Sequence, residues 1–247
     1  MSDKRFARTK MLLGNEGICK LNKSKIMIIG LGAVGGYVLE ALARSGVGNF
    51  VLVDFDKFEE SNINRQILAL DETIGLNKTY VAKQRINQIN PEAKVEIVDV
   101  FVNEETIDKI LNYKPDFVID AIDALNPKCC LIQTLVEQKI PFISSMGAAL
   151  KTDPSKIKIG NLSNSKNCSL AKFVRKRLRK RNIDISQIRC VWSEEQINLP
   201  DNAIEFDNSD DTKGRIRHTL GSLPTITAIF GLTIANEAIL TLSGYKK

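Results

Sequence analysis

A glycine-rich turn near the amino end of the chain is the first feature that could do chemistry. The motif GLGAVG follows a short apolar run and opens a segment with helical spacing. Glycines in such a turn let the backbone approach a ligand closely, and the amino end of the following helix faces an anionic phosphate. A purely structural turn is the alternative. The pattern predicts a nucleotide site at Gly30, Gly32, Ala33 and Gly35.

Five polar residues beyond this turn indicate which nucleotide binds. Asp54 ends the next apolar run, where an acid can accept hydrogen bonds from a ribose. The stretch SNINRQ places Asn62, Asn64 and Arg65 over the same crevice, and Lys78 begins a helix. Arginine and lysine suit a triphosphate whose α-phosphate gains charge during displacement. They favour ATP over the dinucleotide of a NAD-dependent oxidoreductase, the alternative that would leave them without a shared task.

A carboxylate on a third strand is the candidate metal ligand. The motif DAIDA (120–124) ends an apolar run, so Asp123 is expected at the same edge of the sheet. A carboxylate there can hold Mg²⁺ that bridges phosphate oxygens. The alternative is that Asp123 caps the helix that follows.

Strands that alternate with helices must position these residues. Apolar runs predict strands over 25–30, 49–56, 95–101, 116–123 and 141–147, and helical spacing predicts helices over 33–46, 76–89, 103–112 and 127–138. This alternation predicts an α/β fold with a Rossmann-like, doubly wound, mainly parallel sheet. Residues 1–150 are expected to form the ATP-binding domain.

The remaining segment, 151–247, predicts a smaller C-terminal α/β appendage of the same unit, which contacts the substrate and supports a dimer. Strands are expected over 156–160 and 188–192, on either side of a basic helix. The apolar segment 223–244 is nearly long enough to cross a membrane, but it contains Pro224, Asn236 and Glu237. We therefore interpret it as a core or dimer-interface helix, with no membrane span.

Charge is unevenly distributed along the chain. The protein has 247 residues and a net charge of +6. Seven basic residues lie in 170–182, whereas 194–211 holds seven acids and no lysine or arginine. This asymmetry favours an anionic partner such as RNA for the basic segment, and a solvated helix face is the alternative. The charged amino terminus lacks the apolar run of a secretory signal, which predicts a cytoplasmic location.

The cysteines and the single histidine carry weaker signals. Five cysteines without a CxxC pair predict neither disulfides nor a cysteine-based zinc site. Cys190 has apolar neighbours, so we interpret it as a small buried residue of a strand, with a thioester-forming nucleophile as the alternative. His218 is interpreted as a surface loop residue.

Together these motifs make the chain similar to a known family, the adenylating enzymes related to ThiF, MoeB, HesA and the ubiquitin-activating enzymes. The resemblance covers residues 5–147 and rests on GLGAVG, GVGNFVLVDFD, SNINRQ, IGLNK, INP and DAID, in that order. One departure is Ala33, where the family usually has glycine.

The resemblance implies a role for each matching residue. Gly32 and Ala33 would lie against the nucleotide, and Asp54 would bind its ribose. Asn64, Arg65 and Lys78 would contact phosphates, and Asp123 would serve the magnesium ion. Arg8 looks like the family's N-terminal arginine, which reaches the active site of a partner subunit, so a homodimer is implied.

Within the family, the second half resembles the branch that acts on tRNA, the threonylcarbamoyladenosine dehydratases. This likeness rests on GAALKTDPSKIKI, the basic stretch and CVWSEE. It implies ATP-dependent adenylation of the threonine carboxylate of N6-threonylcarbamoyladenosine, followed by cyclisation with release of AMP. Activation of a small ubiquitin-like or sulfur-carrier protein is the alternative, and a non-enzymatic tRNA-binding module is another. A sulfur-transfer accessory protein is a further conceivable partner.

Overall fold

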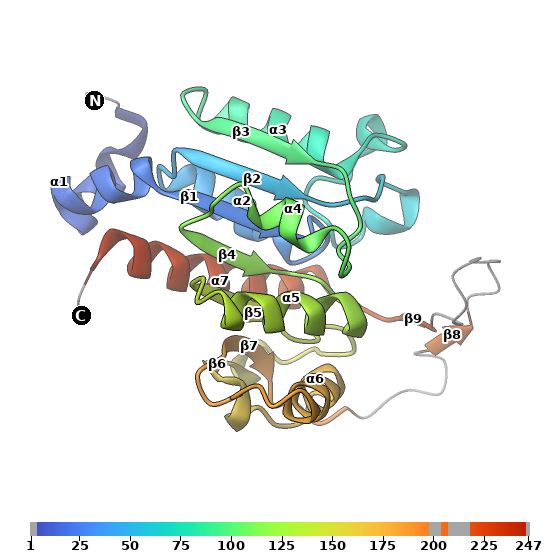
Figure 1. Ribbon diagram of the computed structural model, residues 1–247. Helices are drawn as coiled ribbons and strands as arrows, with labels where there is room; N and C mark the ends of the chain where they lie inside the picture. Colours follow the sequence, from blue (N-terminus) through green and yellow to red (C-terminus); the bar gives the residue numbers. More distant parts are fainter. Residues whose placement is uncertain (1–3, 198–203, 207–217, 246–247) are drawn as a thin grey trace.

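A computed structural model describes residues 4–197, 204–206 and 218–245. Its centre is a seven-stranded sheet with the order β3-β2-β1-β4-β5-β7-β6 (Figure 1). The strands are β1 Lys25–Ile29, β2 Asn49–Val53, β3 Lys94–Val98, β4 Phe117–Asp120, β5 Phe142–Ser145, β6 Ile157–Asn161 and β7 Arg189–Ser193. All neighbours pair in parallel except β6, which runs antiparallel to β7. The predicted α/β class and mainly parallel sheet are confirmed.

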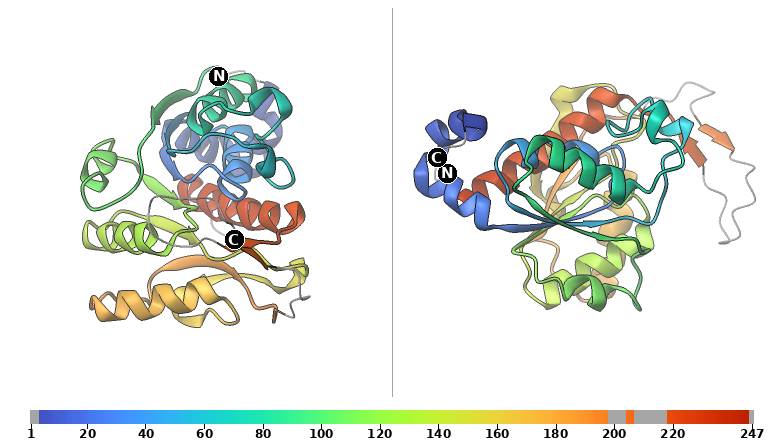
Figure 2. Two further views of the ribbon diagram at one scale, coloured as in Figure 1. Left: turned by 90° about the vertical axis from the view of Figure 1, so that its right-hand side faces the viewer. Right: turned by 90° about the horizontal axis from the view of Figure 1, so that it is seen from above.

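Helices cover both faces of this sheet (Figure 2). The α-helices are α1 Ala7–Lys23, α2 Gly35–Arg44, α3 Lys78–Ile89, α4 Ile107–Leu111, α5 Leu125–Glu137, α6 Ser169–Lys180 and α7 Pro224–Ser243. Side chains alternate along β1, so Ile26 and Ile28 join the core with α2, α3 and α7, whereas Met27 and Ile29 face α4 and α5. Strands buried on both faces explain the continuous apolar runs in the sequence.

The C-terminal elements share the main sheet. β7 pairs with β5, and β6 extends the edge beyond β7. α6 packs on α5 over a second apolar cluster that includes Val174 and Leu178. A short hairpin, β8 Ile204–Phe206 and β9 His218–Leu220, follows. His218 therefore begins a strand, while its side chain and most of the acidic segment 194–211 lie outside the described residues.

α7 is long and apolar enough to cross a membrane by length and composition. In the fold it packs against α1, α2 and the sheet. A side chain at Gly231 would approach the Val34 carbonyl oxygen to 2.6 Å, so the glycine is what allows α7 to cross α2 closely. This packing supports the interpretation of the segment as a core helix.

The order of the strands reverses between β1 and β4. From β1 the chain continues to β2 and β3 in one direction along the sheet, and from β4 it continues to β5 in the other direction. Open parallel sheets bind ligands in the crevice beyond the carboxyl ends of the strands at such a point. That edge lies on the right in Figure 1.

Candidate functional site

The glycine-rich turn lies at this crevice and connects β1 to α2. Gly30 has a φ of +91°, a left-handed conformation that favours glycine. A side chain at Gly35 would lie 1.8 Å from the Gly30 carbonyl oxygen, so only glycine closes the turn here. Val34 caps α2 and has no polar side-chain atom to offer the first amides of the helix. These amides and the helix dipole make the turn suitable for phosphate.

Asp54 directly after β2 connects the two loops of the crevice. Its carboxylate accepts hydrogen bonds from the Leu31 amide at 2.6 Å and from the Asp56 amide at 2.9 Å. Burial raises the pKa of Asp54 above its usual value, against the opposing effects of the nearby Lys78 charge and of both amides. Asp54 therefore fixes the turn after β1, next to the place where a ribose is expected.

Lys78 is the first residue of α3 and is almost fully buried. Its Nζ lies 3.1 Å from Asp56 Oδ2 and 5.9 Å from the centre of the Phe58 ring. Its amide donates to the Asp56 carbonyl oxygen at 3.0 Å, which ties α3 to the loop after β2. The structure therefore holds the Lys78 ammonium beside Asp54 and Asp56, at the crevice where the sequence predicts it.

The SNINRQ segment brings Asn64 and Arg65 together. Arg65 Nη1 donates to Asn64 Oδ1 and to the Ser61 carbonyl oxygen, both at 2.7 Å. Asn64 Nδ2 in turn donates to the Ser222 carbonyl oxygen, just before α7, at 3.3 Å. Asn62 is buried, and its Oδ1 accepts the Glu59 amide, so its side chain supports the turn itself. The phosphate contacts predicted for Asn64 and Arg65, and the nucleotide contact predicted for Asn62, stay predictions.

Gln66 is a site candidate that the residue types did not single out. Its Oε1 is buried and has no hydrogen-bond partner in the described part of the chain. Its amide group is also the nearest neighbour of Gly32, 3.9 Å from where a Cβ would lie, and nothing closer approaches among the described residues. An unpaired buried oxygen beside an open turn fits a bound polar group such as a nucleotide. The sequence signal for Gln66 was its position at the end of the SNINRQ motif.

Asp123 lies at the same edge, in the loop after β4, and is exposed. α5 begins at Leu125 with Ala124 as its cap residue, so Asp123 does not cap the helix. Across the described ranges, no group of three or more histidine, cysteine or acidic side chains could hold a metal ion. A single carboxylate fits Mg²⁺, which is usually bound by one or two carboxylates together with substrate phosphates.

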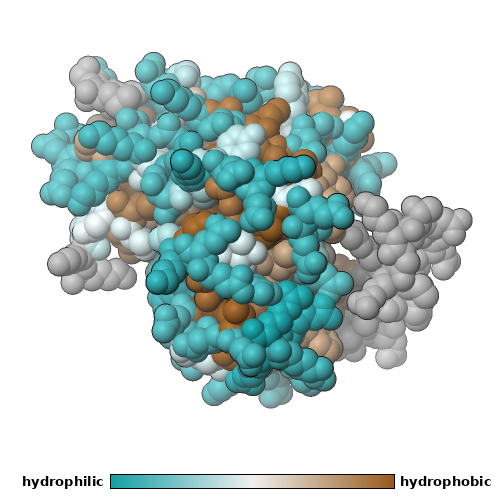
Figure 3. Space-filling view, viewed as in Figure 1, coloured by the Kyte–Doolittle hydropathy of each residue, from teal (hydrophilic) through white to brown (hydrophobic). Residues whose placement is uncertain are grey.

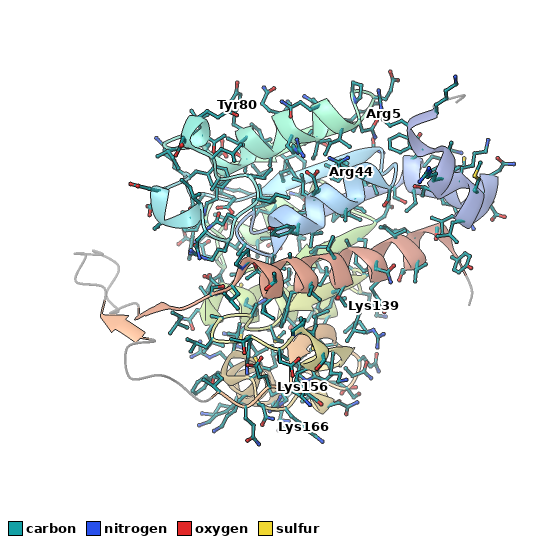
Figure 4. All side chains as sticks on the ribbon, turned by 180° about the vertical axis from the view of Figure 1, so that it is seen from behind. Arg5, Arg44, Tyr80, Lys139, Lys156 and Lys166 are labelled. Carbon is teal, nitrogen blue, oxygen red and sulfur yellow. The ribbon has the colours of Figure 1, made fainter. Side chains whose placement is uncertain are left out.

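Arg8 lies on α1, at the opposite end of the sheet. The carbonyl oxygens of Lys23, the last residue of this helix, and of Ser24 accept hydrogen bonds from Asn49 Nδ2 at the start of β2. Arg5, just before α1, lines a pocket with Arg85 and Ile89 at the end of α3 that lies away from Lys78. Figure 4 accordingly labels Arg5 and Tyr80 near opposite ends of α3. One chain therefore does not bring Arg8 to Arg65 and Lys78.

Cys190 lies in β7 and is fully buried. Burial, the largest cause, raises the pKa of its thiol to about 12. A thiol with this pKa is not a nucleophile at neutral pH. The interpretation of Cys190 as a small buried residue is confirmed.

Comparison with known proteins defines the family. The model of the ThiF family matches residues 6–247. The chain belongs to this family. The match extends over both halves of the chain, so the resemblance seen in the motifs is confirmed, and residues beyond 147 belong to the family's sequence as well.

Within the ThiF family, the most similar relatives match the chain over nearly its full length. The tRNA threonylcarbamoyladenosine dehydratase of Bacillus subtilis is 36% identical, over 96% of this chain and 94% of the relative. The crystal structure of the E. coli tRNA N6-threonylcarbamoyladenosine dehydratase in complex with ATP has a TM-score of 0.86 and 31% identity, over 98% and 94% of the two chains. By contrast, the sulfur carrier protein adenylyltransferase of Thermus thermophilus, 36% identical, matches 48% of this chain and 44% of its own.

Proposed function

We propose that this chain is an ATP-dependent tRNA threonylcarbamoyladenosine dehydratase. The threonine carboxylate of N6-threonylcarbamoyladenosine attacks the α-phosphate of ATP and releases pyrophosphate. An atom of the carbamoyl group then closes the ring and expels AMP, with net loss of water. The observation that carries the proposal is the full-length match to relatives of that name, together with the phosphate turn and the Arg65 and Lys78 cations at one crevice.

Each residue of the crevice has a separate role in the proposed reaction. The turn at Gly32 and Ala33 contacts the nucleotide, and Asp54 orients the ribose. Asn64, Arg65 and Lys78 bind phosphate, and the two cations stabilise charge that develops during displacement. Asp123 would hold Mg²⁺, which would supply further positive charge to the phosphates. The adenylation step requires no protein general base, because the attacking carboxylate is already ionised at neutral pH. Ring closure releases one proton from the carbamoyl group as AMP leaves.

A homodimer would place Arg8 at the active site of the partner subunit. Met11 and Leu12, in the next turn of α1, have exposed fractions of 84% and 70%. Exposed apolar side chains of this size beside a functional arginine support a docking surface for α1. The dimer also accounts for the distance of Arg8 from the crevice of its own chain.

The exposed face of α6 is the proposed tRNA contact. Ala171, Val174 and Leu178 bury the opposite face of this helix. Arg175 bonds Ser165 and Arg177 bonds Asn126, so these two arginines serve the fold as well. The exposed basic residues follow helical spacing and are Lys172, Lys176, Arg179 and Lys180. Figure 3 shows a hydrophilic surface over this helix, which suits tRNA phosphates.

Activation of a sulfur-carrier protein is the second candidate. It accounts for the shared crevice, but the relatives of that type match only about half of the chain. The exposed basic face of α6 favours RNA. We place the reaction in the cytoplasm, and we leave a sulfur-transfer accessory protein as a further partner to be tested by co-purification.

Pyrophosphate release tests the proposal. The protein is mixed with Mg²⁺ and ATP alone, or together with unmodified tRNA, threonylcarbamoylated tRNA or a small sulfur-carrier protein. Release and AMP formation should occur with threonylcarbamoylated tRNA, and mass spectrometry of the nucleoside should show the loss of one water. Release driven by the carrier protein alone would overturn the choice of substrate.

A further inference from the structure

Three buried polar side chains lie beneath the loop that carries Asp123. Lys128 from α5 and Asp120 from the end of β4 both have an exposed fraction of 0%, and Lys128 Nζ lies 2.6 Å from Asp120 Oδ2. Ser144 from β5 donates its hydroxyl to the same oxygen at 2.5 Å. Lys128 also donates to Ser144 Oγ at 3.2 Å. The three groups form a closed network that joins two strands and a helix.

A buried ion pair of this kind is weak as a source of stability. Removing two charges from water costs about as much as their attraction returns, and apolar residues of similar volume often serve as well. Cys129, Leu131 and Ile132, which follow Lys128 on α5, are buried as well. The place of the network in the fold, rather than its energy, therefore points to its role.

The second oxygen of Asp120 holds the loop itself. Asp120 Oδ1 accepts the backbone amide of Ile122 at 3.1 Å, one residue before Asp123. The Ala121 amide donates to the Ile29 carbonyl oxygen at 2.9 Å. The Ala121 carbonyl oxygen lies 2.8 Å from where a Cβ of Gly30 would be. The loop is thus held between the Asp120 carboxylate and the glycine-rich turn.

We propose that Lys128 is a positioning residue for Asp123. By fixing the Asp120 carboxylate, Lys128 sets the backbone at Ile122 and with it the distance of Asp123 from the glycine-rich turn. It touches neither ATP nor the substrate. This inference rests on the proposed function, in which Asp123 serves the magnesium ion bound with ATP.

Lys128→Met tests the role in the full-length protein, with Asn90→Ala as the matched control. Asn90 is also buried, and its Nδ2 donates to the Val47 carbonyl oxygen at 3.0 Å, two residues before β2 and away from the crevice. Two readouts do not depend on turnover. Hydrogen exchange reports on the Ile122 amide in the ligand-free protein, and calorimetry of ATP binding gives the Mg²⁺ concentration for half-maximal affinity.

Lys128→Met should raise that Mg²⁺ concentration about tenfold or more, as loss of a supporting partner does at metal sites, and should speed exchange at Ile122. Asn90→Ala should lower the Tm and leave both readouts unchanged. If Lys128→Met does not fold, Ser144→Ala removes one donor to Asp120 without unpairing a charge, and it should shift both readouts in the same direction by less. A folded variant with wild-type Mg²⁺ dependence and wild-type exchange would overturn the proposal.

Asp123→Asn separates this inference from the proposed function. If Asp123→Asn leaves the Mg²⁺ dependence unchanged, the assignment of the metal ligand fails, and the positioning of Asp123 loses its purpose. If Asp123→Asn and Lys128→Met both raise the Mg²⁺ requirement, whereas only Lys128→Met speeds exchange at Ile122, the positioning role is supported.

Discussion

Replacing Gly32 by alanine separates a requirement of the fold from a requirement of the ligand. A Cβ at Gly32 would find the Gln66 amide group at 3.9 Å as its nearest neighbour among the described residues, which is ordinary van der Waals contact. The backbone φ of Gly32 is not among the left-handed values. Alanine should therefore change the free energy of unfolding by no more than about 1 kcal/mol.

Nucleotide binding should respond very differently. If phosphate oxygens accept hydrogen bonds from the turn at about 2.9 Å, a methyl group on Gly32 forces them outward by about 1 Å. A displacement of that size breaks a hydrogen bond to the charged phosphate, and such a bond contributes about 1.5 to 3 kcal/mol. We therefore expect ATP affinity to fall about 10- to 100-fold.

Calorimetry of ATP binding and thermal unfolding of the ligand-free protein together check the prediction. Gly147→Ala is the control for a generic loss of glycine, because its Cβ would meet Cys168 Sγ and Leu170 Cβ at 3.5 Å, and it should change neither quantity greatly. Gly35→Ala should unfold the turn, since its Cβ would lie 1.8 Å from a backbone oxygen. Gly32→Ala with wild-type ATP affinity would refute the idea that phosphate lies against this residue.

Three further predictions concern charge. Arg65→Ala should abolish ATP-dependent adenylation and leave the circular dichroism spectrum and Tm intact, because Arg65 Nη1 donates to two exposed residues of its own turn, Ser61 and Asn64. Normal pyrophosphate release would contradict its role. Replacing Lys172, Lys176 and Arg179 by glutamine should weaken tRNA binding and reduce the slope of log affinity against log salt by about 2 to 3. An unchanged slope would mean that the basic face of α6 is a solvated helix face that does not contact tRNA. Because burial raises the pKa of Asp54, ATP affinity should begin to decline at a higher pH than the pH at which an exposed aspartate is protonated. Asp54→Asn should bind ATP weakly and should not show that decline.

The raised pKa of Asp54 also has a defined consequence for stability. A carboxyl whose folded-state pKa lies above the unfolded value contributes stability below that unfolded value, about 3.9, and loses it as the pH rises through the folded-state pKa. The ionised Asp54 carboxylate, which orients a ribose in the proposed function, therefore lowers the free energy of unfolding. Stability and binding should therefore change in opposite directions over this pH window.

The strands could be predicted because burial on both faces leaves continuous apolar runs. Boundaries were less accurate where a side chain competes with the backbone. The run 49–56 ends as a strand at Val53, since the Asp54 carboxylate turns back to the Leu31 amide. The helix expected over 103–112 is confined to Ile107–Leu111, because Asn103 Oδ1 accepts the Thr106 amide and forms a turn there.

The site was predictable only where chemistry and chain position coincide. Asp54 directly follows a strand, and Lys78 begins a helix. The parallel sheet brings such positions to one edge. Gln66 and Lys128 carry no comparable signal, because a glutamine in a polar stretch and a lysine on a helix are ordinary surface residues by type.

What distinguishes Gln66 and Lys128 is burial, which depends on tertiary packing. Lys128 occupies a position on α5 that faces the sheet, where an apolar residue would satisfy the helical pattern better. A polar residue at a buried position of an apolar pattern lowers the stability of the fold locally, and such residues concentrate at functional sites. The departure at Lys128 lies directly beneath Asp123, and the unpaired oxygen of Gln66 lies beside Gly32. Both departures therefore border the crevice that the glycine-rich turn and the polar residues after the strands had located.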